Sequence, residues 1–460
     1  MVFSSISFIY LFLPVFLIVY YKVPEKFKNH ILCFGSLAFY IIGSIERPLH
    51  ILVFIICLIV NWRVGIKIQK TKKSKRGLDL FWLAAGVAAN LLNLFYFKYM
   101  SFIWGELGGG ELNIVLPIGI SFYTFQAISY IADVYRGSCH PAASLIDFVA
   151  YLAMFPQLIA GPIVTYPTVE EALYSNKTER VRFVSGAEIF ILGLGSKVLL
   201  ANQIGGLWRQ CVGIGFESIT VPMAWMSIFA YSFQLYFDFC GYSLMAIGLG
   251  RMLGFEFPEN FRDPYMAVSM TDFWRRWHMS LGSWFREYVY FPLGGSKRGF
   301  SRTILNLLTV WMLTGIWHGA GYNFILWGFV LFVLIALERL GLKDFFETHR
   351  FIGHLYMLFA IPLTWALFVN TDFSNLKLFF QRLVGLGDTV AVFTEDYIKY
   401  GKQYGILLLA CLFFSTDLPR RLKKRIHGSP AYYLAMLVIF CGVAYCLYKG
   451  MDDPFLYFQF

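Results

Sequence analysis

The chain has 460 residues, of which 58% are hydrophobic and only 15% are charged. Soluble globular proteins carry about 25% charged residues, so this composition excludes a soluble enzyme, a disordered chain and a disulfide scaffold. The net charge of +11 is typical of basic cytoplasmic loops beside anionic lipid. Because the apolar stretches are continuous and a helical span needs about 20 residues, we expect an all-α, polytopic membrane protein. It has room for about 10–12 transmembrane helices plus re-entrant or interfacial helices.

Apolar runs predict the membrane helices in chain order. The first run lacks a basic leader and a small-residue cleavage site, so we interpret it as a retained span and not as a signal peptide. The runs are 6–21, 30–44, 49–62, 80–97, 114–132, 145–164, 184–204, 222–250, 301–317, 322–338, 351–370, 403–416 and 431–448.

Two basic stretches set the expected orientation. KIQKTKKSKR (67–76) and RRLKKRIH (420–427) should both face the cytoplasm, which places Met1 and Phe460 on the outer side. The eight cysteines show no CxxC or CxxH spacing. The sequence therefore suggests neither a disulfide framework nor a metal site.

The run 145–164 is irregular. It contains Pro156, Gly161 and Pro162 within FPQLIAGPIV. Two prolines and a glycine break a helix unless its freed backbone groups find partners. We predict a re-entrant or broken segment here, and an ordinary kinked span is the alternative.

Asp238 lies inside an apolar run, in YFDFCGYS. An acid within a span is costly and is a functional candidate by default. It needs an arginine, a histidine or water as its partner. Pairing with His318 or His278 would orient an imidazole, and the sequence leaves this choice open.

The segment TDFWRRWHMSLGSWFREYVYFPLGGSKRG (271–299) predicts a basic, amphipathic helix with an aromatic side. Thr271 would cap its start. The segment suits either an anionic ligand such as a nucleotide diphosphate or an interfacial anchor against lipid head groups. Its basic candidates for a ligand site are Arg275, Arg276, Arg286, Lys297 and Arg298.

His318 stands between two apolar runs in MLTGIWHGAGYN, beside Trp317 and several glycines. A histidine among apolar neighbours is suited to general-base chemistry because its ordinary pKa is near neutrality. A histidine that only packs between helices is the alternative interpretation.

Several of these motifs together resemble the membrane-bound O-acyltransferase superfamily. The resemblance is strongest to its bacterial branch of alginate and peptidoglycan O-acetyltransferase membrane subunits, with the teichoic acid D-alanyl transfer protein as a relative. The motifs are FPQLIAGPIV, FDFCGYS, ENFRDPY, TDFWRRWHMSLGSWFREYVYFPLGGSKRG, WHGAGYNFILWG and the terminal FLYFQF.

The resemblance implies tilted helices around a central tunnel that joins the two membrane faces. His318 matches the catalytic histidine of the family pattern, and His278 matches its first histidine. Arg275, Arg276, Arg286, Lys297 and Arg298 would then bind the donor, while Asp238, Trp317 and Asn260 would support the tunnel. The implied donor is acetyl-CoA from the cytoplasm, with no permanently bound cofactor. The resemblance also implies that this protein lies in the bacterial inner membrane and that a separate extracytoplasmic acetyltransferase completes delivery to a polysaccharide.

Departures from the family pattern leave the acceptor open. Cys240 stands where the alginate-type pattern has serine, and Leu244 where it has an acid. The YFPLGGSKRG stretch resembles acetyl-transferring members more than D-alanyl ones. D-alanyl transfer to teichoic acid, a small-metabolite transporter and a non-catalytic scaffold are the alternatives.

We expect one membrane domain over residues 1–460. Within it, 1–110 would hold N-terminal helices, 111–340 the catalytic core motifs and 341–460 the C-terminal helices.

Overall fold

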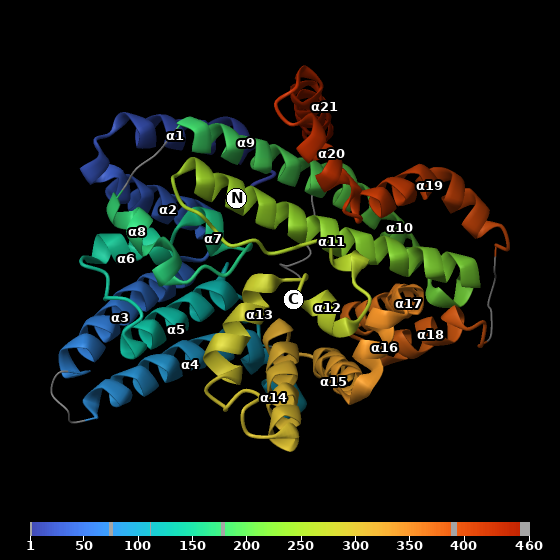
Figure 1. Ribbon diagram of the computed structural model, residues 1–460, viewed down its shortest axis with the longest axis horizontal. Helices are drawn as coiled ribbons and strands as arrows, with labels where there is room; N and C mark the ends of the chain where they lie inside the picture. Colours follow the sequence, from blue (N-terminus) through green and yellow to red (C-terminus); the bar gives the residue numbers. More distant parts are fainter. Residues whose placement is uncertain (1, 73–76, 111, 176–179, 388–392, 451–460) are drawn as a thin grey trace. The chain divides into compact units, whose positions relative to one another are not determined.

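The computed structural model describes residues 2–72, 77–110, 112–175, 180–387 and 393–450. Within these ranges the regular structure is helical and no strand forms, which confirms the all-α class (Figure 1). Part of the first basic stretch (73–76), the two chain ends used for the predicted orientation and the final FLYFQF motif lie outside the described residues.

Most helices follow the predicted apolar runs. The α-helices are α1 (Leu13–Lys22), α2 (Lys28–Ser44), α3 (Pro48–Lys72), α4 (Leu78–Glu106), α5 (Ile120–Arg136), α6 (Leu145–Leu152), α7 (Phe155–Leu158), α8 (Tyr166–Ser175), α9 (Arg180–Gly195), α10 (Asn202–Ile214), α11 (Val221–Met252), α12 (Met270–Trp274), α13 (Met279–Phe285), α14 (Phe300–His318), α15 (Tyr322–Leu337), α16 (Lys343–Thr348), α17 (Arg350–Val369), α18 (Phe373–Leu383), α19 (Asp396–Phe414), α20 (Leu418–Ile426) and α21 (Pro430–Tyr448). The shorter turns are η1 (Phe8–Phe12), η2 (Glu25–Phe27), η3 (Ser196–Ala201), η4 (Phe216–Ser218), η5 (Pro264–Met266), η6 (Arg286–Tyr290) and η7 (Glu338–Leu342).

Among the described residues, six helical stretches are long and apolar enough to cross a membrane, which supports a multi-pass membrane protein. The helix Phe8–Lys22 is apolar but shorter. The predicted total of about 10–12 spans and their sidedness stay predictions. The six stretches are Pro48–Lys72, Leu78–Glu106, Arg180–Ile214, Tyr322–Thr348, Arg350–Val369 and Pro430–Tyr448.

The predicted break in 145–164 is confirmed. Helix α6 ends at Leu152, α7 covers only Phe155–Leu158, and the chain beyond is irregular up to α8. The Gly161 backbone has φ 111, a conformation that L side chains rarely adopt. Residues 148–164 are all buried, so the irregular backbone is enclosed by protein. Whether it is re-entrant stays a prediction.

The chain forms two compact units that interleave along the sequence. The first contains the described residues of Met1–Phe190, Tyr242–Glu259 and Ser283–Tyr288. The second contains those of Ile191–Gly241, Asn260–Gly282 and Val289–Phe460. The expected organisation as a single membrane domain stays a prediction.

In the first unit, α3, α4 and α5 pack side by side (Figure 1). Two buried asparagines join α3 to α4: the Asn61 amide donates to Oδ1 of Asn90 at 3.1 Å, and the Asn90 amide donates to Oδ1 of Asn61 at 2.7 Å. Polar side chains within a span are tolerated when they satisfy one another across helices.

In the second unit, α14 and α15 pack closely because glycines face each other. A Cβ atom added to Gly328 would lie 2.5 Å from the carbonyl oxygen of Trp311, and one added to Gly315 would meet the carbonyl oxygen of Phe324. Small residues at such contacts let two helix backbones approach. This contact fixes the end of α14, where His318 lies.

We predict that Gly328→Ala lowers the free energy of unfolding by about 1–3 kcal/mol, because the added methyl overpacks a backbone contact that has no room for it. Thermal unfolding in detergent checks this. Gly405→Ala in α19 is the matched control: no atom lies within 4 Å of its added Cβ, so its stability should stay equal or rise slightly. An equal loss in both variants would contradict the close contact.

Candidate active site

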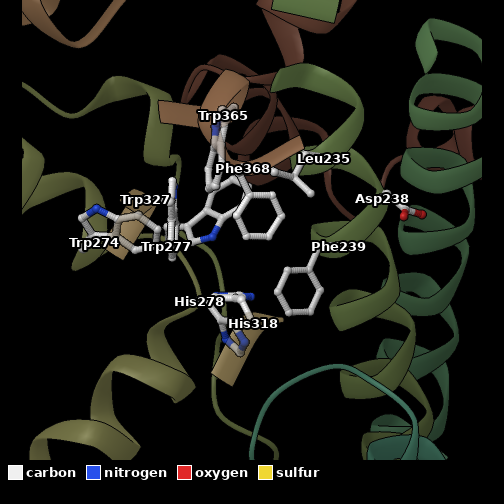
Figure 2. Close-up of a pocket in the computed structure, with 10 residues that line it drawn as sticks. All are labelled: Leu235, Asp238, Phe239, Trp274, Trp277, His278, His318, Trp327, Trp365 and Phe368. Atoms are coloured by element: carbon white, nitrogen blue, oxygen red, sulfur yellow. The ribbon is translucent and has the colours of Figure 1, made fainter. Parts of the chain in front are cut away.

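A narrow cavity of about 30 Å³ lies within the second unit. Helices α11, α12, α14, α15 and α17 contribute to its wall. Both histidines that the sequence predicts as catalytic line it, and Figure 2 shows their rings beside each other. The lining residues are Leu235, Asp238, Phe239, Trp274, Trp277, His278, His318, Trp327, Trp365 and Phe368.

His318 is the last residue of α14 and is half-buried. Its ring lies edge-on to Trp327 and Phe368, with centroid distances of 5.1 and 5.2 Å, and 4.8 Å from the ring of Trp317. The helix ends here because Gly319 is extended and the chain turns back into α15. The close pairing of α14 with α15 thus places this imidazole among aromatic rings at the cavity.

His278 lies in the turn between α12 and α13 with φ 44, a left-handed conformation that is uncommon outside glycine and clusters at functional sites. Its side chain is buried, and its ring is edge-on to Phe239 at 4.7 Å. Nδ1 lies 3.1 Å from Oδ1 of Asn260, and Nε2 has no hydrogen-bond partner among the described residues. The residue is outside the six spans, and burial lowers its pKa to about 3. The ring is therefore neutral at neutral pH.

The segment 271–299 does not form the single amphipathic helix that its pattern predicts, because α12 and α13 are separate helices. The loop that precedes α12 forms hydrogen bonds with the backbone groups at the break. The N–H of Arg262 donates to the carbonyl of Arg276 at 2.9 Å, and the N–H of Met279 donates to the carbonyl of Asn260 at 2.9 Å. Since these groups are satisfied from the side, the helix opens without leaving them unpaired.

The start of α12 is also fixed differently from the prediction. Ser269, and not Thr271, is the N-cap residue: its hydroxyl accepts from the N–H of Asp272 at 3.1 Å. The buried carboxylate of Glu338 accepts from the N–H groups of Met270 and Thr271. A negative charge is favourable at a helix start. Glu338 of η7 therefore stabilises the position of α12, which carries Trp274 of the cavity lining.

Asp238 has a partner that the sequence analysis did not consider. Its carboxylate accepts from Nζ of Lys197 at 2.7 Å, and both side chains are buried. Figure 2 shows the carboxylate directed towards the neighbouring helix and away from the two histidines. The available signal was Lys197 itself, a charged residue inside the apolar run 184–204, where a lone charge is costly.

The two other residues predicted to support a tunnel lie against the histidines. Trp317 is buried, with its ring 6.3 Å from that of His278 and 4.8 Å from that of His318. Asn260 contacts the His278 ring. The structure therefore gathers both predicted catalytic residues and all three predicted support residues around one cavity.

The predicted donor-binding cations do not line this cavity. Arg276 pairs with Asp272 at 2.9 Å, and the other four are exposed on the protein surface. Arg286 belongs to the first unit, and the remaining cations belong to the second. The five residues are Arg275, Arg276, Arg286, Lys297 and Arg298.

The sequence analysis did not identify most of the aromatic residues that line the cavity. Trp327 lies in the WHGAGYNFILWG motif and could have been predicted, whereas Trp365 and Phe368 lie in an apolar run without any charged neighbour that would mark them. Tryptophan in a membrane helix is common, so only the packing shows that these rings close one cavity.

Comparison with known proteins shows which family the chain belongs to. Residues 141–351, which include both histidines, match the membrane-bound O-acyltransferase family. The chain is 34% identical to the probable alginate O-acetylase AlgI of Pseudomonas putida, with all of both chains covered. It is 31% identical to the peptidoglycan O-acetyltransferase of Helicobacter pylori, covering 84% of this chain and 80% of that protein.

A more distant similarity, 27% identity, links it to the teichoic acid D-alanyltransferase of Bacillus subtilis, covering 62% of this chain and 74% of that protein. The similarity to the probable alginate O-acetylase extends over the complete length of both chains. The chain belongs to the membrane-bound O-acyltransferase family and is an acyl-transferring membrane enzyme.

Proposed function

We propose that this enzyme takes an acetyl group from acetyl-CoA on the cytoplasmic side for O-acetylation of a cell-envelope polysaccharide. The acceptor would be alginate, peptidoglycan or a similar exopolysaccharide. The observation that carries the proposal is the shared cavity of His278 and His318, enclosed by aromatic rings. The similarity to an alginate and a peptidoglycan O-acetyltransferase supports the acceptor class.

In this proposal neutral His318 takes the proton of an acceptor hydroxyl while the oxygen attacks the thioester carbonyl carbon. A C–O bond forms and the C–S bond breaks. The departing thiolate takes up the proton from the imidazolium, which leaves an O-acetyl ester, a free thiol and a neutral imidazole. Because a hydroxyl is a poor nucleophile at neutral pH, a positioned base is worth about 10²–10⁴-fold in rate.

The cavity favours a small, uncharged acyl group. Its volume of about 30 Å³ leaves room for only a few heavy atoms. A D-alanyl group would add an ammonium, and Asp238, the acid in the cavity wall, is already paired with Lys197. Aromatic faces attract a cation by about 0.5–2 kcal/mol, but removing an ammonium from water costs several kcal/mol. Acetyl transfer is therefore preferred over D-alanyl transfer.

The predicted cations of 271–299, four of them exposed and the fifth, Arg276, paired with Asp272, are proposed to bind the donor, because arginine and lysine pair well with the phosphates of coenzyme A. The enzyme would lie in the bacterial inner membrane with both chain ends outside, since the basic stretches 67–76 and 420–427 favour the cytoplasmic face. An extracytoplasmic acetyltransferase would receive the acetyl group or deliver it to the polysaccharide.

We predict that His318→Gln abolishes polymer O-acetylation, because glutamine has similar reach but no basic nitrogen. A loss of at least about 10²-fold in transfer from labelled acetyl-CoA is expected, with unchanged amounts of protein in the membrane. A transporter or a scaffold would keep its function in this variant. Near-normal acetylation would contradict the assignment of His318.

We predict that Trp327→Leu increases the use of propionyl-CoA relative to acetyl-CoA, because the Trp327 side chain is fully buried and its ring closes the cavity wall. The specificity ratio should change by about tenfold, the effect of one methylene in an apolar pocket. Trp208→Leu is the matched control: this tryptophan is buried in α10 and does not line the cavity. If both variants kept the wild-type ratio, Trp327 would not limit the acyl length.

We predict that the triple variant Arg276→Gln, Lys297→Gln and Arg298→Gln raises KM for acetyl-CoA by about tenfold, since each solvent-exposed ion pair contributes about 0.2–1 kcal/mol. The turnover number should change less. A matched triple variant of Arg421, Lys424 and Arg425 removes the same charge from α20 and should leave KM for the donor unchanged. If the two triple variants had equal KM values for acetyl-CoA, the assignment of the donor site to 271–299 would be wrong.

A further inference from the structure

The hydrogen bonds around Asn260 define the protonation of His278. Oδ1 of Asn260 accepts from the backbone N–H of Ser280 at 3.2 Å and from its hydroxyl at 2.8 Å. A backbone N–H only donates, so the atom that faces it must be the amide oxygen and not the amide nitrogen. The orientation of this amide is thereby determined by the main chain.

The same oxygen lies 3.1 Å from Nδ1 of His278. Since an amide oxygen only accepts, Nδ1 must carry the hydrogen. A neutral imidazole has one N–H, so Nε2 then carries a lone pair. Burial keeps the ring neutral by lowering its pKa. In this tautomer His278 cannot donate a hydrogen bond from Nε2 to a thioester carbonyl oxygen.

Backbone hydrogen bonds on both sides of His278 stabilise the contact between its ring and Asn260. Besides the Asn260 side chain, the Asn260 carbonyl accepts from the N–H of Met279 at 2.9 Å, and the N–H of Gly282 donates to the His278 carbonyl at 3.1 Å. These bonds maintain the left-handed backbone of His278, a conformation that persists only when its surroundings over-determine it. The Asn260 side chain is 1% exposed, so water does not compete for its oxygen.

Nε2 of His278 is an acceptor that no protein group in the described residues uses. His278 lines the cavity, and its Nε2 is buried and has no hydrogen-bond partner among the described residues. Buried polar atoms in proteins almost always have a partner, and an acceptor without one in a binding cavity indicates a ligand that supplies a hydrogen.

We propose that Asn260 is a positioning residue that holds His278 in the Nδ1–H tautomer, so that Nε2 accepts a hydrogen bond from an N–H or O–H group of a bound substrate. The inference rests on the proposed acyl transfer. Two groups have the required chemistry: an amide N–H along the thioester donor, and the hydroxyl of the acceptor. In both cases His278 is a second acceptor beside His318 and not a donor that stabilises the oxyanion.

The charges around this ring are few. The titratable groups that line the cavity with His278 are His318 from α14 and Asp238 from α11, and Asp238 is paired with Lys197 from η3. Replacing Asn260 with aspartate would add a carboxylate directly on Nδ1. A carboxylate stabilises the imidazolium and raises its pKa. Activity would then be lost as the pH falls through this raised value, because the protonated ring has no lone pair.

The tautomer is tested directly by ¹⁵N NMR of histidine-labelled protein in lipid nanodiscs, with His278→Gln to assign the signals. We expect a protonated Nδ1 and an unprotonated Nε2 in the wild type, and loss of this single tautomer in Asn260→Leu. Asn90→Leu is the matched control, since Asn90 is a buried asparagine that bonds to Asn61 and Gly86. It should leave the His278 signals unchanged. A wild-type Nε2–H would overturn the proposal.

Kinetics complete the test. Asn260→Leu should lower acetyl transfer by roughly 10²-fold, the scale of losing an oriented acid–base group. Asn260→Asp should recover most of this activity and shift the acidic limb of the pH profile to higher pH.

The KM values of Asn260→Leu identify the partner of Nε2. A higher KM for acetyl-CoA identifies the donor amide, and a higher KM for the polysaccharide identifies the hydroxyl. If Asn260→Asp showed no shift and no recovery, the positioning role would be wrong. Absence of transfer in a wild type with the expected tautomer would instead reject the proposed function alone.

Discussion

The site depends on one constraint: a helix that opens in an apolar protein must have its backbone groups satisfied by another segment. Between α12 and α13 the loop that contains Asn260 meets this need, with main-chain bonds to Arg276 and Met279. The opened turn then exposes the His278 ring to the cavity. Without the loop the segment would close into a continuous helix, and His278 would have no reason to adopt its left-handed backbone. The geometry of the site therefore follows from the pairing of two irregular segments.

Charge in the cavity wall is balanced before any substrate binds. Lys197 and Asp238 are both buried, and their atoms are 2.7 Å apart. Removing one partner of such a pair leaves an uncompensated buried charge, at a cost of about 3–5 kcal/mol. The pair also links η3 to α11, and a π-helical turn inside a longer helix is frequent at functional sites. With Asp238 paired, the two histidines are the other titratable groups that line the cavity.

The aromatic rings give the cavity its small size and its apolar lining. Trp274 and Trp277 come from α12 and the turn after it, Trp327 from α15 and Trp365 from α17, yet their rings lie within 5.0–6.4 Å of neighbouring aromatic rings in one cluster. Rigid rings lose little conformational freedom on packing, so they define a small volume better than aliphatic chains do. An apolar cavity suits acyl transfer, because water in the site would compete with the acceptor for the acyl group.

The sequence by itself determined the membrane class and most helix positions, and it singled out His318 as the candidate catalytic base. It also located the broken segment 145–164. These features are local: apolar run length sets a helix, and prolines or glycines mark a break. The break at His278 has no such mark, because FWRRWHMS contains neither proline nor glycine. It arises only when the loop that precedes α12 folds back and forms hydrogen bonds with the backbone groups at the break. Likewise Lys197 and Asp238 are 41 residues apart, and only the packing of η3 against α11 makes them partners, since pairing across that distance depends on which helix faces which.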